Sequence, residues 1–309
     1  MICLKIKNLK FKIAIAIVVL VLFFANTTAV KAQVISLSIW PPLLEVQMMP
    51  GKTVIQNYQL VNNTDSALEI TPLLYPFLPA GENGQIKMLD NAPDQTDRSP
   101  FFFSFSSGEK MAQPFLLKPK ETRQIGLKIT LPKSSSEKDY YYTLLFSTST
   151  GSPEKEKNQT ASVTQIGTNI LLTCSRVEKP PLLGRIFEFS APQIIDSFSL
   201  VDFNLVLENF GATFFKPFGQ ISVTGIFGQK DEIKLFEQNV LANSKRKLLI
   251  SSFKPKLPLG VFKAKLEFSL NEEGALPVLT KEISFWYLPY KLLSGLIVFI
   301  LIIIFFKKT

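Results

Sequence analysis

Between residues 33 and 287 the dominant feature of the sequence is the alternation of apolar and polar residues with a period of two, interrupted by clusters of turn-forming residues. No window of about a dozen residues in this region shows the spacing of an amphipathic helix. The clearest run is QIGLKITL at residues 124–131, in which the aliphatic side chains fall on one face. The pattern predicts an all-β chain whose strands turn one face to a core and the other to water.

Two sets of strands are predicted, separated near residues 176–183. The run EKPP at residues 178–181 cannot continue a central strand because proline lacks the amide donor. We therefore predict two tandem immunoglobulin-like β-sandwiches, over residues 33–177 and 178–288. The predicted strands span residues 34–40, 43–48, 54–61, 68–75, 101–105, 124–131, 140–147, 162–173, 184–190, 201–207, 219–226, 232–236, 247–252, 262–268 and 278–286.

Residues 1–32 are typical of a signal peptide. Lysines precede an apolar run at residues 13–24, and a polar stretch then ends in the small residues of Val30-Lys31-Ala32. This ending favours cleavage between Ala32 and Gln33. An uncleaved N-terminal anchor is the alternative, although the apolar run is short for a hydrocarbon layer of about 30 Å.

A second apolar segment, residues 292–306, contains no charged residue. It reaches the roughly 20 residues of a spanning helix when the aromatic residues before it form an interfacial belt. The predicted helix covers residues 289–306, followed by a cytoplasmic tail at residues 307–309. Both sandwiches then lie outside the plasma membrane in a single-pass topology. The predicted membrane-interface residues are Trp286, Tyr287, Tyr290, Lys291, Lys307 and Lys308.

The net charge of +9 comes from the two ends of the chain. Of the 34 Lys and Arg residues, five lie in residues 1–32 and three in residues 289–309, whereas all 25 Asp and Glu residues lie between these segments. The region between them carries 26 positive and 25 negative charges, so it has no electrostatic footprint for a polyanion. Nucleic acid is therefore not an expected partner.

The sequence contains no histidine, which excludes Ser-His-Asp and Cys-His catalysis and the usual zinc sites. Ser-x-x-Lys spacings occur, but the Lys-Thr-Gly motif of serine-lysine enzymes does not. We expect no enzymatic activity, no cofactor and no metal, and we assign no catalytic or ligand-binding residue. A hydrolase that uses carboxylates alone is the open alternative, because folding can bring such a pair together without a local motif.

Two asparagines close predicted strands in corresponding places, Asn62 in the first half and Asn209 in the second, and each is followed by a turn. This shared formula indicates a similar architecture in the two halves. Asn62 also begins a glycosylation sequon, as does Asn158, and such triplets usually report a surface position.

Cys174 is the only cysteine after residue 32, so no intrachain disulfide is expected. Its apolar neighbours predict a buried thiol. The aromatic run at residues 101–105 is predicted to lie in a core rather than to form a ligand platform. Long loops are predicted at residues 79–100 and 149–161.

Several short motifs resemble those of WxL-interacting cell-surface proteins of bacteria. IWPPLLEV at residues 39–46 and VNNT at residues 61–64 resemble the start of the peptidoglycan-binding domain of that family, and NFGAT at residues 209–213 and FWYLP at residues 285–289 resemble its second sandwich. The resemblance implies two sandwiches, a membrane anchor and binding to cell-wall glycan. This chain has Leu43-Leu44 where the family has an Asn-Gln pair, and no contact residue is assigned from the resemblance.

Three functions are consistent with these features. The first is an anchored extracytoplasmic binding or scaffold protein that attaches to cell-wall glycan or to another surface protein. The second is an assembly chaperone that offers a strand edge to client proteins by β-augmentation. The third is the carboxylate-based hydrolase, which requires a cleft holding two acidic side chains.

Overall fold

The computed structural model describes residues 36–89, 101–150, 162–256, 259–271 and 278–308. In this part of the chain the structure is built from strands, followed by one apolar helix, α2 (Tyr290–Lys308). The strands form two tandem immunoglobulin-like β-sandwiches, which confirms the fold class predicted from the period-two pattern.

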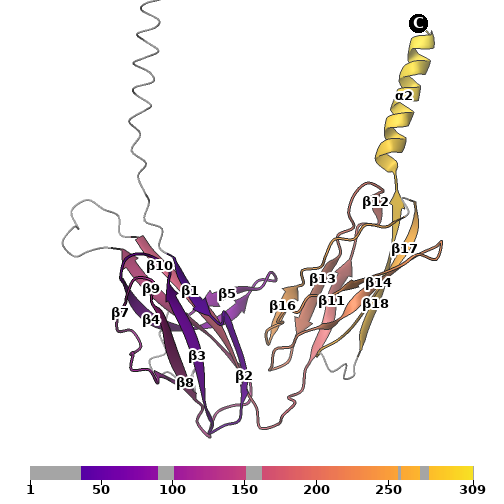
Figure 1. The fold of residues 1–309 in the computed structure, drawn as a ribbon. Coiled ribbons are helices and arrows are strands. Elements are labelled where there is room, and N and C mark those ends of the chain that lie inside the picture. Colours follow the sequence, from indigo (N-terminus) through magenta and orange to yellow (C-terminus); the bar gives the residue numbers. More distant parts are fainter. Residues whose placement is uncertain (1–35, 90–100, 151–161, 257–258, 272–277, 309) are drawn as a thin grey trace, which may run out of the picture. The chain divides into compact units, whose positions relative to one another are not determined.

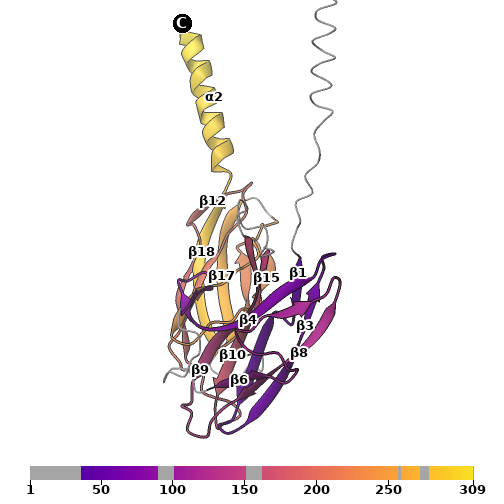
Figure 2. The ribbon, with the colours of Figure 1, turned by 90° about the vertical axis from the view of Figure 1, so that its left-hand side faces the viewer.

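The first sandwich consists of two sheets. One sheet has the order β1 (Leu37–Trp40), β3 (Thr53–Asn62), β8 (Thr122–Thr130) and β6 (Phe102–Phe105). The other has the order β2 (Leu43–Met48), β10 (Ser162–Cys174), β9 (Asp139–Thr150), β4 (Leu68–Ala80) and β5 (Gln85–Met88), and β7 (Phe115–Leu117) also pairs with β4. Figure 2 shows β3 and β8 of the first of these sheets lying side by side.

The chain crosses from one sheet of this sandwich to the other at the cis peptide bond between Trp40 and Pro41. Before this bond β1 pairs with β3, and after it β2 pairs in parallel with β10. The two short strands are thus one segment divided between two sheets.

The core of the first sandwich follows the alternation seen in the sequence. Ile125, Leu127 and Ile129 of β8 are fully buried, as is the adjoining Leu131. Phe101 is also buried and packs edge-on against Tyr140 and Tyr142. The core interpretation of the aromatic run therefore holds for Phe101, whereas the neighbouring Phe102 is exposed.

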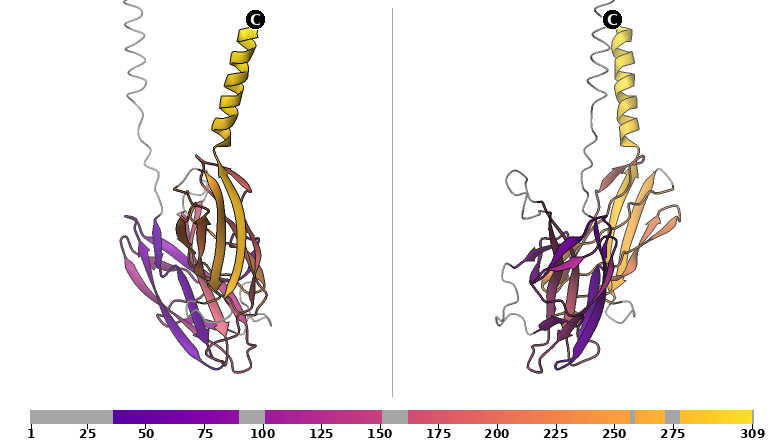
Figure 3. Two further views of the ribbon diagram at one scale, coloured as in Figure 1. Left: turned by 90° about the vertical axis from the view of Figure 1, so that its right-hand side faces the viewer. Right: turned by 60° about the vertical axis from the view of Figure 1, so that its left-hand side comes forward.

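The second sandwich has the same two-layer construction. Its smaller sheet has the order β11 (Gly184–Ser190), β13 (Asn204–Asn209) and β16 (Ser244–Lys247). Its larger sheet has the order β12 (Ile194–Asp196), β18 (Leu279–Leu288), β17 (Gly260–Ser269), β14 (Phe218–Gly225) and β15 (Lys230–Lys234). The helix α2 continues from the end of β18, as the yellow ribbon shows (Figures 1 and 3).

The structure departs from the predicted elements in several places. The short strands β5, β7 and β12 were not predicted, because three or four residues show no usable period. The segment expected as a loop at residues 79–100 contains the end of β4 and all of β5. The strand expected at residues 247–252 is displaced, since β16 ends at Lys247. Residues 151–161, including the sequon at Asn158, lie outside the described residues.

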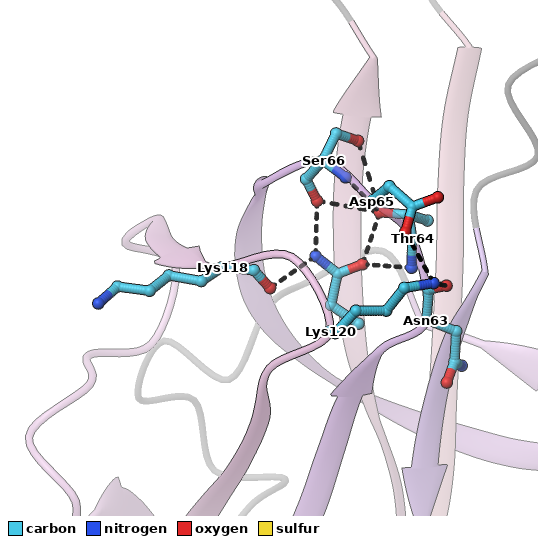
Figure 4. A network of polar contacts seen from close by, with 7 residues as sticks. Asn63, Thr64, Asp65, Ser66, Lys118 and Lys120 are labelled. Carbon is cyan, nitrogen blue, oxygen red and sulfur yellow. Dashed lines mark hydrogen bonds and ion pairs between the residues drawn. The ribbon is translucent and has the colours of Figure 1, made fainter.

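Asn62 forms a buried corner at the end of β3. Its side-chain amide donates to the backbone oxygens of Ser66, Leu117 and Lys118, and its carbonyl oxygen accepts from the amide and the hydroxyl of Thr64. Figure 4 shows Thr64, Ser66 and Lys118 gathered in this network. Asn62 is fully buried, so the sequon reports an internal turn rather than an accessible glycan acceptor.

Asn209 repeats this arrangement at the end of β13. Its amide donates to the backbone oxygens of Thr213 and Val240, and its carbonyl oxygen accepts from the amide of Gly211. Like Asn62, it is almost completely buried. The asparagine and turn shared by the two halves of the sequence therefore have the same structural role. In each half the asparagine side chain forms hydrogen bonds with the buried backbone groups of a turn.

Replacing either asparagine should leave several buried polar groups without hydrogen-bond partners. We expect Asn62→Ala and Asn209→Ala each to lower the free energy of unfolding by about 2–4 kcal/mol. Asp65→Ala is the matched control for the first corner. Asp65 is 94% exposed and forms only a surface ion pair with Lys120, so its loss should cost no more than about 0.5 kcal/mol.

Denaturant unfolding of the full chain in detergent measures these differences. An Asn62→Ala variant as stable as Asp65→Ala would contradict the role of the corner.

Candidate protein-binding edge

Half of strand β10 has an open hydrogen-bonding edge. On one side, β9 pairs with β10 from Ser162 to Thr173. On the other side, β2 pairs only with residues 169–174, because its first partner is Asn169 opposite Leu43. Among the described residues, no strand pairs with the outer edge of residues 162–168.

Backbone hydrogen bonds show which residues of β10 face this open edge. The amide of Asn169 donates to Pro42 and that of Ser175 to Met48, both on the β2 side. The amide of Cys174 instead donates to Lys138, on the β9 side. Because the direction alternates along a strand, Gln165 and Gly167 direct their amide and carbonyl groups outward. These amide and carbonyl groups can form hydrogen bonds with the backbone of an added strand.

The open half of β10 carries none of the usual protection against strand addition. Its sequence, SVTQIGT at residues 162–168, contains neither proline nor a charged residue. Natural edge strands are commonly short, charged, interrupted by proline or bulged. Residues 162–168 are therefore an unpaired and uncharged edge within the described structure, and β1 contacts β10 without pairing with it.

The other described edges are less suited to pairing. Strands β1, β5, β6, β7 and β12 have only three or four residues, and β2 carries Glu45. In the second sandwich, β15 (KDEIK) and β16 (SKRK) are highly charged, and β11 contains an irregularity between Ile186 and Glu188. The outer edge of β18 is free over residues 279–285, but it includes Lys281 and Glu282. The uncharged half of β10 stands apart from all of these.

The second half of β10 is held rigidly, by its neighbours and by the second sandwich. Leu171 packs in a small buried cluster with Phe77, Tyr141 and Leu241. The rings of Phe77 and Tyr141 are stacked with their centroids 5.5 Å apart. The open half is thus the continuation of a strand whose position is already fixed.

Buried polar contacts surround this cluster and centre on Asp139, the first residue of β9. Its carboxylate accepts from the hydroxyls of Thr173 and Tyr141 and from the backbone amide of Phe214. The Tyr141 hydroxyl in turn accepts from the amide of Ala242. One carboxylate and one phenol therefore link β9 and β10 to two segments of the second sandwich.

The electrostatics of this junction follow from its removal from water. Burial raises the pKa of the Asp139 carboxyl, against the lowering effect of its three hydrogen bonds. Burial, followed by the nearby Asp139 charge, also raises the pKa of the Tyr141 phenol. Because the folded-state pKa of Asp139 is raised, its contribution to stability is greatest below the unfolded carboxyl range and decreases as pH rises through the raised pKa.

An ion pair lies beside the junction, where Lys216 contacts the Glu45 carboxylate of β2 at 2.6 Å. The same carboxylate accepts from the side-chain amide of Asn239. Glu45 and Lys216 line an open depression of about 440 Å³. No group of three or more Cys, Asp or Glu side chains positioned to hold a metal occurs among the described residues.

The predicted membrane-interface residues separate into two groups. Tyr290 is exposed at the start of α2, Trp286 is half exposed in β18, and Lys307 is exposed near the end of the helix. Tyr287, in contrast, is fully buried, and its hydroxyl donates to the backbone of Ser199. It belongs to the core of the second sandwich because side chains alternate along β18, so adjacent Trp286 and Tyr287 cannot share an environment.

Two further predicted interface residues, Lys291 and Lys308, lie in α2. The Lys291 amide donates to Asp196, and Lys308 is the last residue of α2. Ala32 and Gln33, the predicted cleavage site, lie outside the described residues. Cys174 is buried as predicted, and burial raises the pKa of its thiol. Sequence reasoning identified neither the open edge nor Asp139. The uncharged run at residues 162–168 was the available signal for the edge.

Comparisons with known proteins reveal distant structural likenesses only. No family model and no curated protein matches the sequence. The class 5 fimbriae chaperone CfaA is 10% identical, with a TM-score of 0.41, over 80% of this chain and 98% of that chain. A chain of the CsuC–CsuE chaperone–tip adhesion subunit pre-assembly complex from Acinetobacter baumannii is 12% identical, with a TM-score of 0.39, over 79% of this chain and 98% of that chain.

The complex of the Salmonella enterica SafA pilin with the SafB chaperone gives similar values. Identity is 12% and the TM-score is 0.39, over 82% of this chain and 98% of that chain. Likeness at this level carries no functional argument. The function must be inferred from the contacts of the chain itself.

The Tyr141 hydroxyl provides a direct test of the junction. We expect Tyr141→Phe to destabilise the chain by about 1–3 kcal/mol, because it removes a donor to Asp139 and an acceptor for Ala242. It should also speed proteolysis between residues 177 and 183. Tyr140→Phe is the control, since the Tyr140 hydroxyl contacts only Ser136 within the first sandwich. Equal proteolysis of the two variants would count against the junction.

Proposed function

We propose that the chain is a membrane-anchored, extracytoplasmic protein-binding module. Its open β10 edge pairs with an extended segment of a partner protein, which is β-augmentation. The observation that supports this most strongly is the uncharged, proline-free edge at residues 162–168, with the outward backbone groups of Gln165 and Gly167. Main-chain hydrogen bonds would supply affinity, and the neighbouring side chains would supply selectivity.

The partner in this proposal is another surface or secreted protein rather than cell-wall glycan. An assembly chaperone and a stable scaffold would use the same edge and differ in how long the partner remains bound. Glycan binding derives only from the resemblance to WxL-interacting proteins, and none of the contacts described above supports it. Two acidic side chains, Glu45 and Glu178, line the open depression beside the junction, but the Glu45 carboxylate is already paired with Lys216 and Asn239, so this pair gives the hydrolase little support.

The anchor in this proposal is α2. Residues 290–307 have a mean hydropathy of 2.2, and none of them is buried within the protein. The helix has 19 residues, which at about 1.5 Å per residue gives about 28 Å, close to the thickness of the hydrocarbon layer. Lys307 and Lys308 at its end support an orientation with that end in the cytoplasm and the sandwiches outside, because positively charged flanks are retained on the cytoplasmic side.

Protease accessibility tests this orientation. In intact cells, external protease should degrade both sandwiches, while an epitope placed after Thr309 stays protected until the cells are permeabilised. Replacing Lys307 and Lys308 with Glu should raise the share of chains whose epitope is accessible, because the positive charges that retain this end inside are lost. An epitope that is accessible in intact wild-type cells would refute the orientation.

Substitution of Gln165 tests the edge. Gln165→Pro removes one outward amide and leaves the pairing with β9 in place, so we expect loss of the proteins that co-purify with the full chain from membranes. Gln165→Ala keeps the amide and should retain them. Because Gln165 is exposed, neither change disturbs the core.

A second assay with purified peptidoglycan separates the two kinds of partner. If both Gln165 variants and the wild type bind peptidoglycan equally, and co-purifying proteins are unaffected by Gln165→Pro, the edge is not the binding site.

A further inference from the structure

Exposed apolar side chains gather at the end of the second sandwich from which α2 emerges. Each is between 51 and 66% exposed, although large apolar side chains are usually buried. We refer to them as the apolar collar, which consists of Phe198, Leu200, Ile226, Phe227, Leu259 and Trp286.

Backbone hydrogen bonds and close contacts place the collar segments around the end of β18. The backbone amide of Ser197, next to Phe198, donates to Leu288, the last residue of β18. Gly260 pairs with Tyr287 of β18. A Cβ on Gly260 would lie 3.7 Å from both Ile226 and Phe227. Three loops that are distant in sequence therefore meet beside the start of the helix, on the side where Figure 1 shows β12 and α2.

The collar segments carry no negative charge. Residues 197–200, 226–229 and 259–260 contain no carboxylate. Asp196, which directly precedes the first of these segments, is buried and accepts from the backbone amides of Phe198 and Lys291. Its charge is thus directed at the amides of the first turn of α2, where an anion is favourable. A surface of this kind suits the boundary between lipid headgroups and acyl chains.

No flexible linker separates the sandwich from the helix. Pro289 alone lies between β18 and α2, and its carbonyl already accepts from the amide of Leu293. Asp196 fastens the first helical turn to β12. The chain therefore has no spare residues with which to hold the sandwich away from the start of the helix.

The length of the helix then determines the depth of the sandwich. All 19 residues of α2 are needed to cross about 30 Å of hydrocarbon. With Lys307 at the cytoplasmic surface, Tyr290 must lie at the outer surface. The sandwich end, one residue away, must then lie within the headgroup layer.

We propose that the apolar collar is a membrane-binding surface that inserts into the outer headgroup and acyl boundary of the anchoring bilayer. This rests on the proposed transmembrane role of α2. The collar adds a second hydrophobic contact beside the helix and fixes the tilt of the sandwich above the membrane. The ligand is the phospholipid bilayer itself.

Single-tryptophan variants of the full chain test this proposal in phosphatidylcholine vesicles that contain brominated acyl chains. The chain has two tryptophans, so Trp40→Phe leaves Trp286 as the only tryptophan, which is excited selectively at wavelengths that tyrosine does not absorb. Adding Trp286→Phe and Phe227→Trp moves the fluorophore to a collar loop outside the path of the chain into the helix. We expect brominated lipid to reduce the emission from positions 286 and 227 by roughly half.

Phe218→Trp in the same background is the matched control. Phe218 is 54% exposed and begins β14, whereas the loop that carries Phe227 follows the end of that strand. Phe218 and Gly225 are seven positions apart, which is about 24 Å along the strand. Tryptophan at 218 should keep its emission in brominated vesicles.

Carbonate extraction of the same vesicles distinguishes failure of the collar from failure of the anchor. If the chain resists extraction but position 227 is quenched no more than position 218, the collar does not enter the bilayer and the inference is wrong. If carbonate releases the chain, the proposed anchor fails and this inference fails with it. The collar is supported if the chain resists extraction and brominated lipid quenches tryptophan at position 227 but not at position 218.

Discussion

The partial cover that β2 gives to β10 is the constraint on which the proposed function depends. The chain leaves one sheet at Trp40 and enters the other at Leu43, so only six residues are available to pair with β10. β10 is thirteen residues long and is supported on its other side by β9. An edge is therefore created by topology. It is stable because the rest of the strand is already paired and packed.

No disulfide occurs among the described residues, so buried side chains must stabilise the domains. Cys174 is free and buried, so packing and hydrogen bonds must fix the β10 end of the first sandwich. Asp139 illustrates the cost and the benefit of this solution. A carboxylate is withdrawn from water, which raises its pKa, but its hydrogen bonds specify a single arrangement of β9, β10 and the segments that contact them. Such a network favours a unique structure more than it favours high stability.

Period-two alternation was sufficient to predict the fold class and the longer strands, because Ile125 and its partners on β8 repeat one core face. The same signal could not reveal β5, β7 or β12, which are too short to show a period. The argument from an interfacial aromatic belt placed Trp286 and Tyr287 together at the membrane, although adjacent strand residues face opposite ways. The open edge could not be predicted because it depends on the register between β2 and β10, which no local pattern encodes. The buried state of Asn62 likewise depends on residues 117 and 118, far away in the sequence.

The direct passage from β18 into α2 also has a mechanical consequence. Gly184, where the second sandwich begins, lies near Phe215 and Leu270, at the opposite end of the sandwich from Leu288. A force applied to a bound partner and resisted by the membrane would therefore pull β18 along its own axis. The ladder between β17 and β18 extends over nine residue pairs, and its hydrogen bonds lie across the strands. Such a force loads them together in shear instead of one after another, an arrangement suited to a tether under tension.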